Sequence, residues 1–127
     1  MRVQSAEDLI VWRRAMELVC SVYEVAGRLP PCERYALADQ MRRAVASIPA
    51  NIAEGHARGH RKDFLRFLLI ARGSLAEVET HLKIVVRVGY AAQADIHDSL
   101  SLAEETSRML TAMLRSLQPP RRSDPAR

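Results

Sequence analysis

Apolar residues recur along the chain at intervals of three and four positions, the spacing that places side chains on one face of an α-helix. The pattern occupies four segments, about residues 8–26, 33–54, 61–88 and 93–117. Strand-like alternation and Asn-Gly hairpin signals are absent from the sequence. We therefore predict an all-α chain whose four helices are separated by glycine and proline: Gly27 with Pro30-Pro31, Gly55 with Gly59, Gly89, and Pro119-Pro120.

Each segment carries one main apolar stripe, which we expect to face the core. For the first helix the stripe is Leu9, Trp12, Met16, Val19, Tyr23 and Ala26, with Trp12 as a core anchor and Cys20 also buried. For the second it is Leu37, Met41, Val45, Ile48 and Ile52. For the third it is Phe64, Leu68, Ala71, Leu75, Val78, Leu82 and Val85. For the fourth it is Ile96, Leu100, Ala103, Leu110, Leu114 and Leu117.

Four helices of similar length with short links favour an antiparallel, up-down-up-down four-helix bundle over residues 1–118. Pro49 lies inside the second helical pattern. It removes one backbone donor and frees the carbonyl of Val45, so we expect a kink there and not a stop. The remaining residues, 119–127, are basic and contain proline, and we expect a disordered tail.

The third and fourth helices carry more apolar residues than one seam needs. Phe67, Leu69 and Ile70 widen the arc of the third, and Leu102, Met109 and Met113 form a second strip on the fourth. The outward face of a lone bundle is polar, so a second apolar strip indicates a partner. We therefore expect a homo-oligomer.

Composition excludes several classes of protein. The 127 residues suit one domain, and the 48% apolar share is enough for a core. Two cysteines form no disulfide framework, and zinc-ligand spacing is lacking. Met1 to Glu7 has no signal-peptide apolar region, and no stretch reaches the roughly 18 apolar residues of a membrane span. We expect a cytoplasmic protein with no membrane partner.

Two stretches of sequence are specific enough to indicate a family. They are EDLIVWRRA at residues 7–15 and QMRRAVASIPANIAEG at residues 40–55, followed by GSLAEVET at residues 73–80. With these motifs the chain, over about residues 7–117, resembles the four-helix bundle proteins encoded in intervening sequences of 23S ribosomal RNA genes. It departs from their pattern at Ala91-Ala92-Gln93, where a Ser or Thr cap is usual, and at His81, where an apolar residue or Gln is common.

The resemblance implies an antiparallel four-helix bundle that assembles as a ring-like homopentamer. It also implies a role connected with RNA. The related accessory proteins of diversity-generating retroelements are pentameric bundles too, and their basic surfaces engage nucleic acid and a reverse transcriptase.

A polar stripe runs along the second helix beside its apolar one. It comprises Gln40, Arg43, Ser47, Asn51 and Glu54, and the third helix carries a matching set, Ser74, Glu77 and His81. One interpretation is a polar groove that binds a ligand. The other is a structural hydrogen-bonded network at a helix–helix or subunit seam, which also satisfies the carbonyl freed by Pro49. No set of nucleophile, base and orienting residue is apparent, which favours the structural interpretation.

A basic cluster lies at the link into the third helix. Its members are Arg58, His60, Arg61, Lys62 and Arg66, offset only by Asp63. A nucleic-acid interface would use Arg58, Arg61, Lys62 and Arg66 for phosphate contacts. The alternative is an ordinary solvated helix start, although positive charge there opposes the helix dipole. Phe64 is the one aromatic residue within the cluster, and it belongs to the apolar stripe, so stacking on bases is not supported.

Other candidate chemistry is weak. His56 and His60 are four residues apart, but they have no obvious third ligand for a metal. Glu77 and Glu79 point to different helix faces and do not form a carboxylate pair. We therefore predict no catalytic residues, metal or cofactor.

The net charge of +4 permits a polyanionic partner without requiring one. Arginine outnumbers lysine 17 to 2, and guanidinium groups suit both phosphate contacts and interface ion pairs. The leading hypothesis is a non-enzymatic oligomeric protein that associates with RNA or DNA through its basic surface. The alternative is a structural or protein-binding oligomeric scaffold that does not bind nucleic acid.

Overall fold

The computed structural model describes residues 6–118 and contains four long helices. These are α1 (Ile10–Gly27), α2 (Leu37–Ala57), α3 (Arg61–Arg87) and α4 (Gln93–Leu117). Two short 3₁₀ turns, Ala6–Asp8 and Pro31–Glu33, precede α1 and α2. Within these residues there is no strand, so the all-α prediction is confirmed. The predicted tail, 119–127, and residues 1–5 lie outside the described residues.

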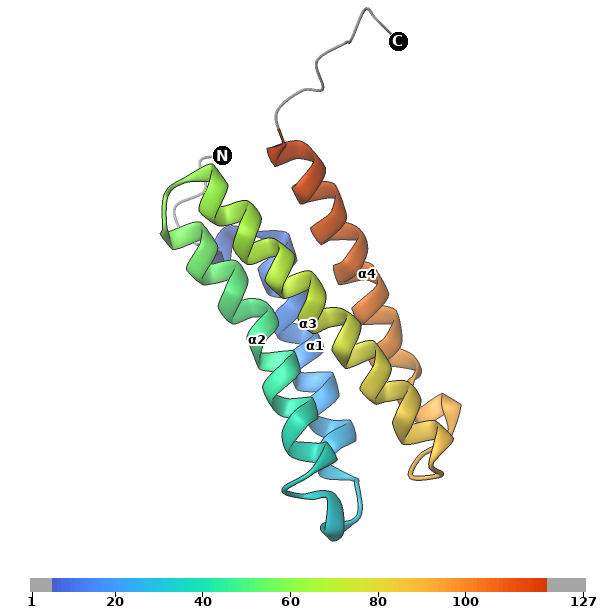
Figure 1. Ribbon diagram of the computed structural model, residues 1–127. Helices are drawn as coiled ribbons and strands as arrows, with labels where there is room; N and C mark the ends of the chain where they lie inside the picture. Colours follow the sequence, from blue (N-terminus) through green and yellow to red (C-terminus); the bar gives the residue numbers. More distant parts are fainter. Residues whose placement is uncertain (1–5, 119–127) are drawn as a thin grey trace, which may run out of the picture.

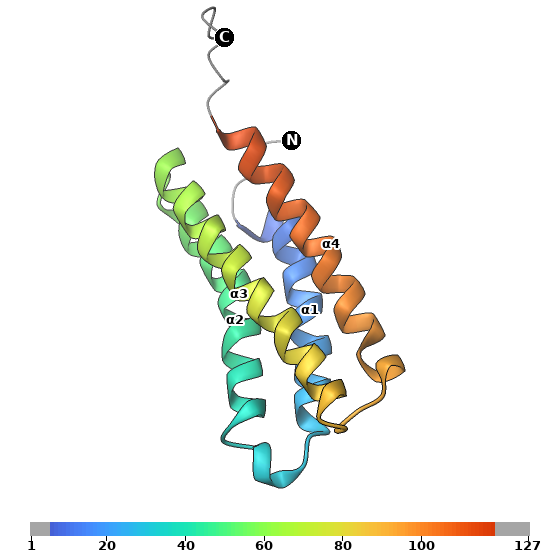
Figure 2. The same ribbon diagram turned by 45° about the vertical axis from the view of Figure 1, so that its right-hand side comes forward.

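Successive helices run up and down along one bundle, as the colour gradient in Figure 1 shows. α1 and α3 each pack against both α2 and α4 but not against one another, so they occupy diagonal corners. Because successive helices run in opposite directions, the α2–α3 turn lies at the same end as the start of α1 and the end of α4, as the rotated view in Figure 2 also shows. No helix in the described part is long and apolar enough to cross a membrane.

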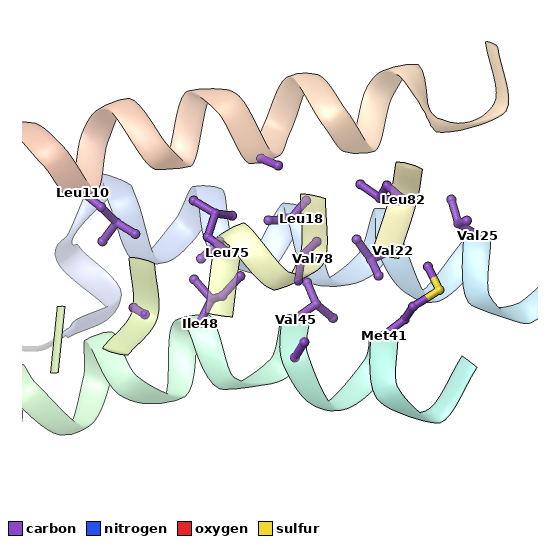
Figure 3. Close-up of a cluster of buried hydrophobic side chains, with 14 of the residues drawn as sticks. Leu18, Val22, Val25, Met41, Val45, Ile48, Leu75, Val78, Leu82 and Leu110 are labelled. Atoms are coloured by element: carbon purple, nitrogen blue, oxygen red, sulfur yellow. The ribbon is translucent and has the colours of Figure 1, made fainter. Parts of the chain in front are cut away.

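The core lies between all four helices. Figure 3 shows Leu18 and Val22 of α1, Val45 and Ile48 of α2 and other labelled side chains meeting along the bundle axis. The predicted stripes of α2, α3 and α4 are buried or packed against this core, as expected. Two polar side chains of α4, Ser99 and Thr106, are buried as well. Each is hydrogen-bonded, Ser99 to Ser21 and Thr106 to the carbonyl of Leu102, as a buried hydroxyl requires.

The stripe predicted for α1 is only partly right. Of its six residues, Ala26 is buried and Leu9, Trp12 and Val19 pack against the edge of the core. The most buried face lies one position away, on Val11, Ala15, Leu18, Val22 and Val25. Met16 and Tyr23 are exposed, Trp12 is half-buried at the edge of the core, and Cys20 is exposed. Both stripes have helical spacing, so periodicity could not choose between them. The bundle buries the stripe with the smaller and branched side chains, which pack closely against α2 and α4.

α2 continues through Pro49, so the helix does not stop there, and the kink expected at this residue stays a prediction. The same helix approaches α3 most closely at Gly55, where an added Cβ would lie 2.7 Å from the Cβ of Phe67 and 3.2 Å from Cδ1 of Phe64. Because the first of these atoms is next to the backbone, no side-chain rotation can remove the clash. Glycine is therefore required at this helix crossing for a steric reason and not for its conformational freedom.

The C-terminus of α3 and the N-terminus of α4 follow known capping rules. Gly89 has φ of 84°, and the N–H groups of Gly89 and Tyr90 donate to the carbonyls of Val86 and Val85. This is the Schellman arrangement at a helix C-terminus. At the start of α4, where the sequence lacks a Ser or Thr cap, the Asp95 carboxylate accepts a 2.8 Å hydrogen bond from the N–H of Ala92. The departure at Ala91-Ala92-Gln93 therefore leaves the helix start capped from within.

Candidate functional site

The predicted basic cluster lies on the α2–α3 turn and the first turns of α3. Arg58 caps the C-terminus of α2, His60 is the residue before α3, and Arg61 and Lys62 open that helix. Arg66 follows one turn later, and all five side chains are exposed. The structure therefore brings the four predicted phosphate-contact residues together at one end of the bundle.

The charges within this cluster are unevenly neutralised. Arg58 is held by Glu54 one turn earlier on α2, with Nη2 to Oε1 at 3.1 Å. Arg61, Lys62 and Arg66 form no ion pair with any described residue. Arg61 and Lys62 also stand in the first turn of α3, where the positive end of the helix dipole opposes a cation by about 0.3–1 kcal/mol. Three cations are thus held together at a local electrostatic cost.

Phe67 positions two of the guanidinium groups. The Cζ atom of Arg66 lies 4.5 Å from the centre of its ring, and that of Arg58 lies 5.1 Å away. Both distances are within the range of cation–π attraction. The Phe67 side chain is itself buried between α2 and α3. A rigid aromatic ring therefore fixes Arg58 and Arg66 relative to the bundle.

A cavity of about 220 Å³ opens beside the cluster. Its walls include His56, His60, Phe64 and Leu117, so the last turn of α4 lies next to the α2–α3 turn. The ring of His56 meets that of Phe64 edge to face, at 5.8 Å between centres. Among the described residues no three His, Cys, Asp or Glu side chains are grouped as a metal site requires. His56 contacts an aromatic ring here, which gives it a packing role.

The predicted polar stripe forms bonds within each helix. Ser47 Oγ donates to the carbonyl of Ala44, and Asn51 Nδ2 donates to the carbonyl of Ser47, both at 2.7 Å. Short polar side chains often bond to their own helix in this way. Gln40 is exposed, and the Arg43 side chain, 80% exposed, pairs with Asp39 at 3.0 Å. No described side-chain bond reaches the carbonyl of Val45 or joins this stripe to α3.

The matching residues of α3 differ in their exposure. Ser74 is half-buried and Glu77 is exposed, whereas His81 is 6% exposed. His81 Nε2 lies 3.6 Å from Glu77 Oε2, and its Nδ1 has no hydrogen-bond partner in the described part of the molecule. Among the described residues, no hydrogen bond or ion pair joins the stripe on α2 to the set on α3.

Exposed apolar side chains concentrate on two helices. On α1 they are Ile10, Met16 and Tyr23, and on α3 they are Leu69, Ile70, Ile84 and Val88. The second strip predicted on α4 consists of Leu102, Met109 and Met113. These residues are half-buried and not fully exposed, because they pack against the edge of the core. The exposed apolar surface expected on α3 is therefore present, and the one expected on α4 is partly covered. The exposed apolar side chains of α1 were not predicted.

Two further apolar areas lie on the surface of the bundle. Between the start of α1 and the end of α4 lies a groove of about 430 Å³ whose walls include Leu9, Ile10, Met109 and Met113. The second is a row of alanines on α2. These residues have helical spacing and are exposed or half-buried: Ala46, Ala50, Ala53 and Ala57. A row of small side chains allows another helix to approach closely.

The fold places the chain among all-α, four-helix bundle proteins. Comparison with known families is more specific, since residues 7–112 match the family described as "23S rRNA-intervening sequence protein". The chain belongs to this family, as its motifs indicated.

A solved structure supports the same fold. It is a protein with unknown function from the S23 ribosomal protein family of Bacteroides thetaiotaomicron, with a TM-score of 0.77 and 22% sequence identity. The match covers 84% of this chain and 99% of that one. No curated protein sequence matches the chain.

Sequence reasoning missed a second group of cations at the opposite end of the bundle. Arg34 and Arg42 meet there in a pocket beneath the α1–α2 link, and Arg42 lies over the ring of Tyr23. Tyr23 and Arg42 lie on either side of the Pro30-Pro31 turn with 18 residues between them, and no local pattern in the sequence indicates that their side chains meet.

Proposed function

We propose that this chain is a non-enzymatic, self-associating protein that contacts the phosphates of RNA or DNA through the α2–α3 end of the bundle. The observation that carries the proposal is the set of three exposed and unpaired cations, Arg61, Lys62 and Arg66, on the first turns of α3. Cations placed against a helix dipole and without carboxylate partners are stabilised by an external anion. The Phe67 ring, which orients Arg66 and Arg58, reduces the entropy that such binding costs.

Self-association is the second part of the proposal. The exposed apolar residues lie on α1 and α3, which occupy diagonal corners of the bundle. When one surface of a molecule pairs with a different surface of the next, the contacts are head-to-tail, and they form a ring if the rotation closes. Two separate apolar surfaces on opposite corners suit this geometry better than a two-fold dimer. A ring of five is the assembly proposed, on the family resemblance.

The two parts support each other. A single basic end offers few phosphate contacts, and a ring displays several copies of that end together. Linked weak contacts bind far more tightly than one alone, provided that the geometry allows simultaneous contact.

Fluorescence anisotropy with structured RNA and duplex DNA, measured across a salt series, tests the nucleic-acid part. Each neutralised phosphate contributes a log–log slope of roughly −0.7 to −0.9. The triple variant Arg61→Gln, Lys62→Gln, Arg66→Gln should weaken binding and make the slope shallower by roughly 2 to 3 per subunit bound. Sequence preference should be slight, because phosphate contacts position a protein without reading bases.

The matched control removes the same charge from elsewhere on the same helix. Arg72, Lys83 and Arg87 are exposed cations of α3 outside the cluster, and none has a described ion pair. The variant with all three changed to Gln should keep most of the binding. Equal loss in both variants would mean that only net charge matters, and no binding by the wild type at low salt would leave the scaffold as the remaining candidate.

The scaffold is the second candidate function because of the apolar groove between α1 and α4 and the alanine row on α2. It requires self-association or a protein partner but no nucleic acid. Sedimentation combined with the anisotropy series separates the two functions, since the scaffold predicts assembly without a salt-dependent nucleic-acid signal.

A further inference from the structure

A small pocket lies under the link between α1 and α2, at the opposite end of the bundle from the basic cluster. Its lining includes Gly27, Pro30, Pro31 and Ala38, together with Arg34 and Arg42. The cavity measures about 160 Å³. Small side chains and a double proline therefore leave a hollow that two arginines border.

Two carboxylates close to this pocket in sequence, Glu33 and Asp39, are already engaged. Glu33 accepts the Tyr90 hydroxyl at Oε2, at 2.6 Å, and the N–H of Leu37 at Oε1, at 3.3 Å. Asp39 is paired with Arg43, Oδ2 to Nε at 3.0 Å. In the part of the chain that the structure describes, neither Arg34 nor Arg42 forms an ion pair. Two arginines thus line the pocket, and neither is paired with a carboxylate of the described residues.

One of the two guanidinium groups is held in place. Arg42 is half-buried, and its Cζ lies 5.8 Å from the centre of the Tyr23 ring. A cation–π contact of this kind restrains an arginine side chain without using its N–H donors. A planar, pre-oriented guanidinium binds the oxygens of a phosphate through two parallel hydrogen bonds.

We infer that the Arg34–Arg42 pocket binds a phosphate group. Pockets that hold whole small molecules usually measure about 300–1,000 Å³, so a cavity of 160 Å³ admits a phosphate group but not a complete nucleotide. The group comes either from a free phosphate compound or from a nucleic acid, whose 5′ end can enter a hollow that an internal phosphodiester cannot. The inference does not depend on the basic cluster of α3.

The test uses the full chain and follows the Nε–Hε resonances of arginine by NMR. Inorganic phosphate is titrated first, followed by a short RNA with a 5′-phosphate and the same RNA with a 5′-hydroxyl. The resonances of Arg34 and Arg42 should shift and saturate together. Arg43, one residue along α2 and paired with Asp39, is the internal control and should not follow them.

Substitutions make the assignment specific. Arg34→Gln with Arg42→Gln should weaken phosphate binding by ~10-fold or more, since each lost charge-assisted bond corresponds to at least about a tenfold change. The matched variant Arg43→Gln should bind as the wild type does. Arg42→Lys keeps the charge but loses the planar fork, and it should bind with intermediate affinity. Circular dichroism of each variant establishes that the bundle is still folded.

The outcomes separate the sources of the phosphate. Shifts with inorganic phosphate and with the 5′-phosphorylated RNA alone support a terminal phosphate, and shifts with inorganic phosphate alone support a free phosphate compound. Equal shifts with both RNAs overturn the choice of a terminal group. The inference fails if no ligand shifts Arg34 and Arg42, or if Arg43 shifts with them. It also fails if the double variant binds as tightly as the wild type, and none of these results depends on the α3 cluster.

Discussion

The hydroxyl of Tyr90 donates a 2.6 Å hydrogen bond to Oε2 of Glu33, across 57 positions of sequence. This bond joins the link between α3 and α4 to the link between α1 and α2. The two connections at one end of the bundle are thereby tied together. The same bond also keeps the Glu33 carboxylate engaged and away from the neighbouring arginines.

The Tyr90–Glu33 bond predicts a dependence of stability on alkaline pH. The bond to Glu33, then burial, raises the pKa of Tyr90 from 10.0 to about 12. Because the folded state holds this proton more tightly, its stabilising effect is fully present below pH 10 and is lost as pH rises from 10 to 12. Chemical denaturation of wild type and Tyr90→Phe across this range should show the difference between them shrinking. A constant difference would mean that the bond is not formed in solution.

Gly55 and Gly73 form a matched pair of helical glycines. Gly55→Ala introduces a Cβ 2.7 Å from that of Phe67, and such overpacking typically costs about 1–3 kcal/mol. Gly73→Ala meets nothing within 4 Å and should stabilise α3 by about 1 kcal/mol. The free energy of unfolding should therefore fall in the first variant and rise in the second. Stabilisation by both would show that α2 and α3 are further apart than described.

Leu18 and Trp12 report which stripe of α1 faces the core. Leu18 is fully buried, so Leu18→Ala should lower the free energy of unfolding by about 2–5 kcal/mol. Trp12 is half-buried, and Trp12→Ala should fall below the ~3–5 kcal/mol of a fully buried aromatic residue. Denaturant titrations in conditions that keep the chain monomeric provide the comparison. A larger loss at Trp12 than at Leu18 would restore the stripe expected from the sequence.

Met16 and Ile70 test head-to-tail assembly. Each is exposed, the first on α1 and the second on α3, so Met16→Glu and Ile70→Glu should each break the ring while preserving the other surface. An equal mixture of the two variants still contains one intact pair of surfaces. Sedimentation should then show a complex near twice 14.3 kDa that neither variant forms alone. Wild type that sediments as a monomer, or variants that still form rings, would contradict the proposed interface.

Sequence periodicity was sufficient for most of the fold. The bounds of α3 and α4 follow the apolar spacing to within a residue, because Gly89 and the Pro119-Pro120 pair mark sharp ends. The start of α2 was less predictable. Glu33 belongs to a separate 3₁₀ turn, and α2 begins only at Leu37, whose N–H donates to the Glu33 side chain. Glycine and proline mark the end of a helix clearly in the sequence. The start of α2 is harder to predict because it depends on a side chain from the preceding turn.

The candidate sites divide in the same way. The basic cluster could be found from the sequence because Arg58 to Arg66 are neighbours along the chain. The pocket of Arg34 and Arg42 could not, because its walls come from the end of α1, the link and the first turns of α2. The sequence also could not show which arginines lack an ion pair. Arg42 and Arg43 are adjacent, and only Arg43 pairs with a carboxylate in the described part of the chain.

The sequence alone determined the class of fold, the number of helices, the family and the position of the α3 cluster, since each depends on spacing over a few turns. The tertiary structure decided which of two apolar stripes α1 buries, where exposed apolar surface remains, and which arginines lack a partner. These depend on how four helices rotate about their axes when they pack. A helix with apolar residues on two faces satisfies its own periodicity in either orientation, and only the other three helices select between them.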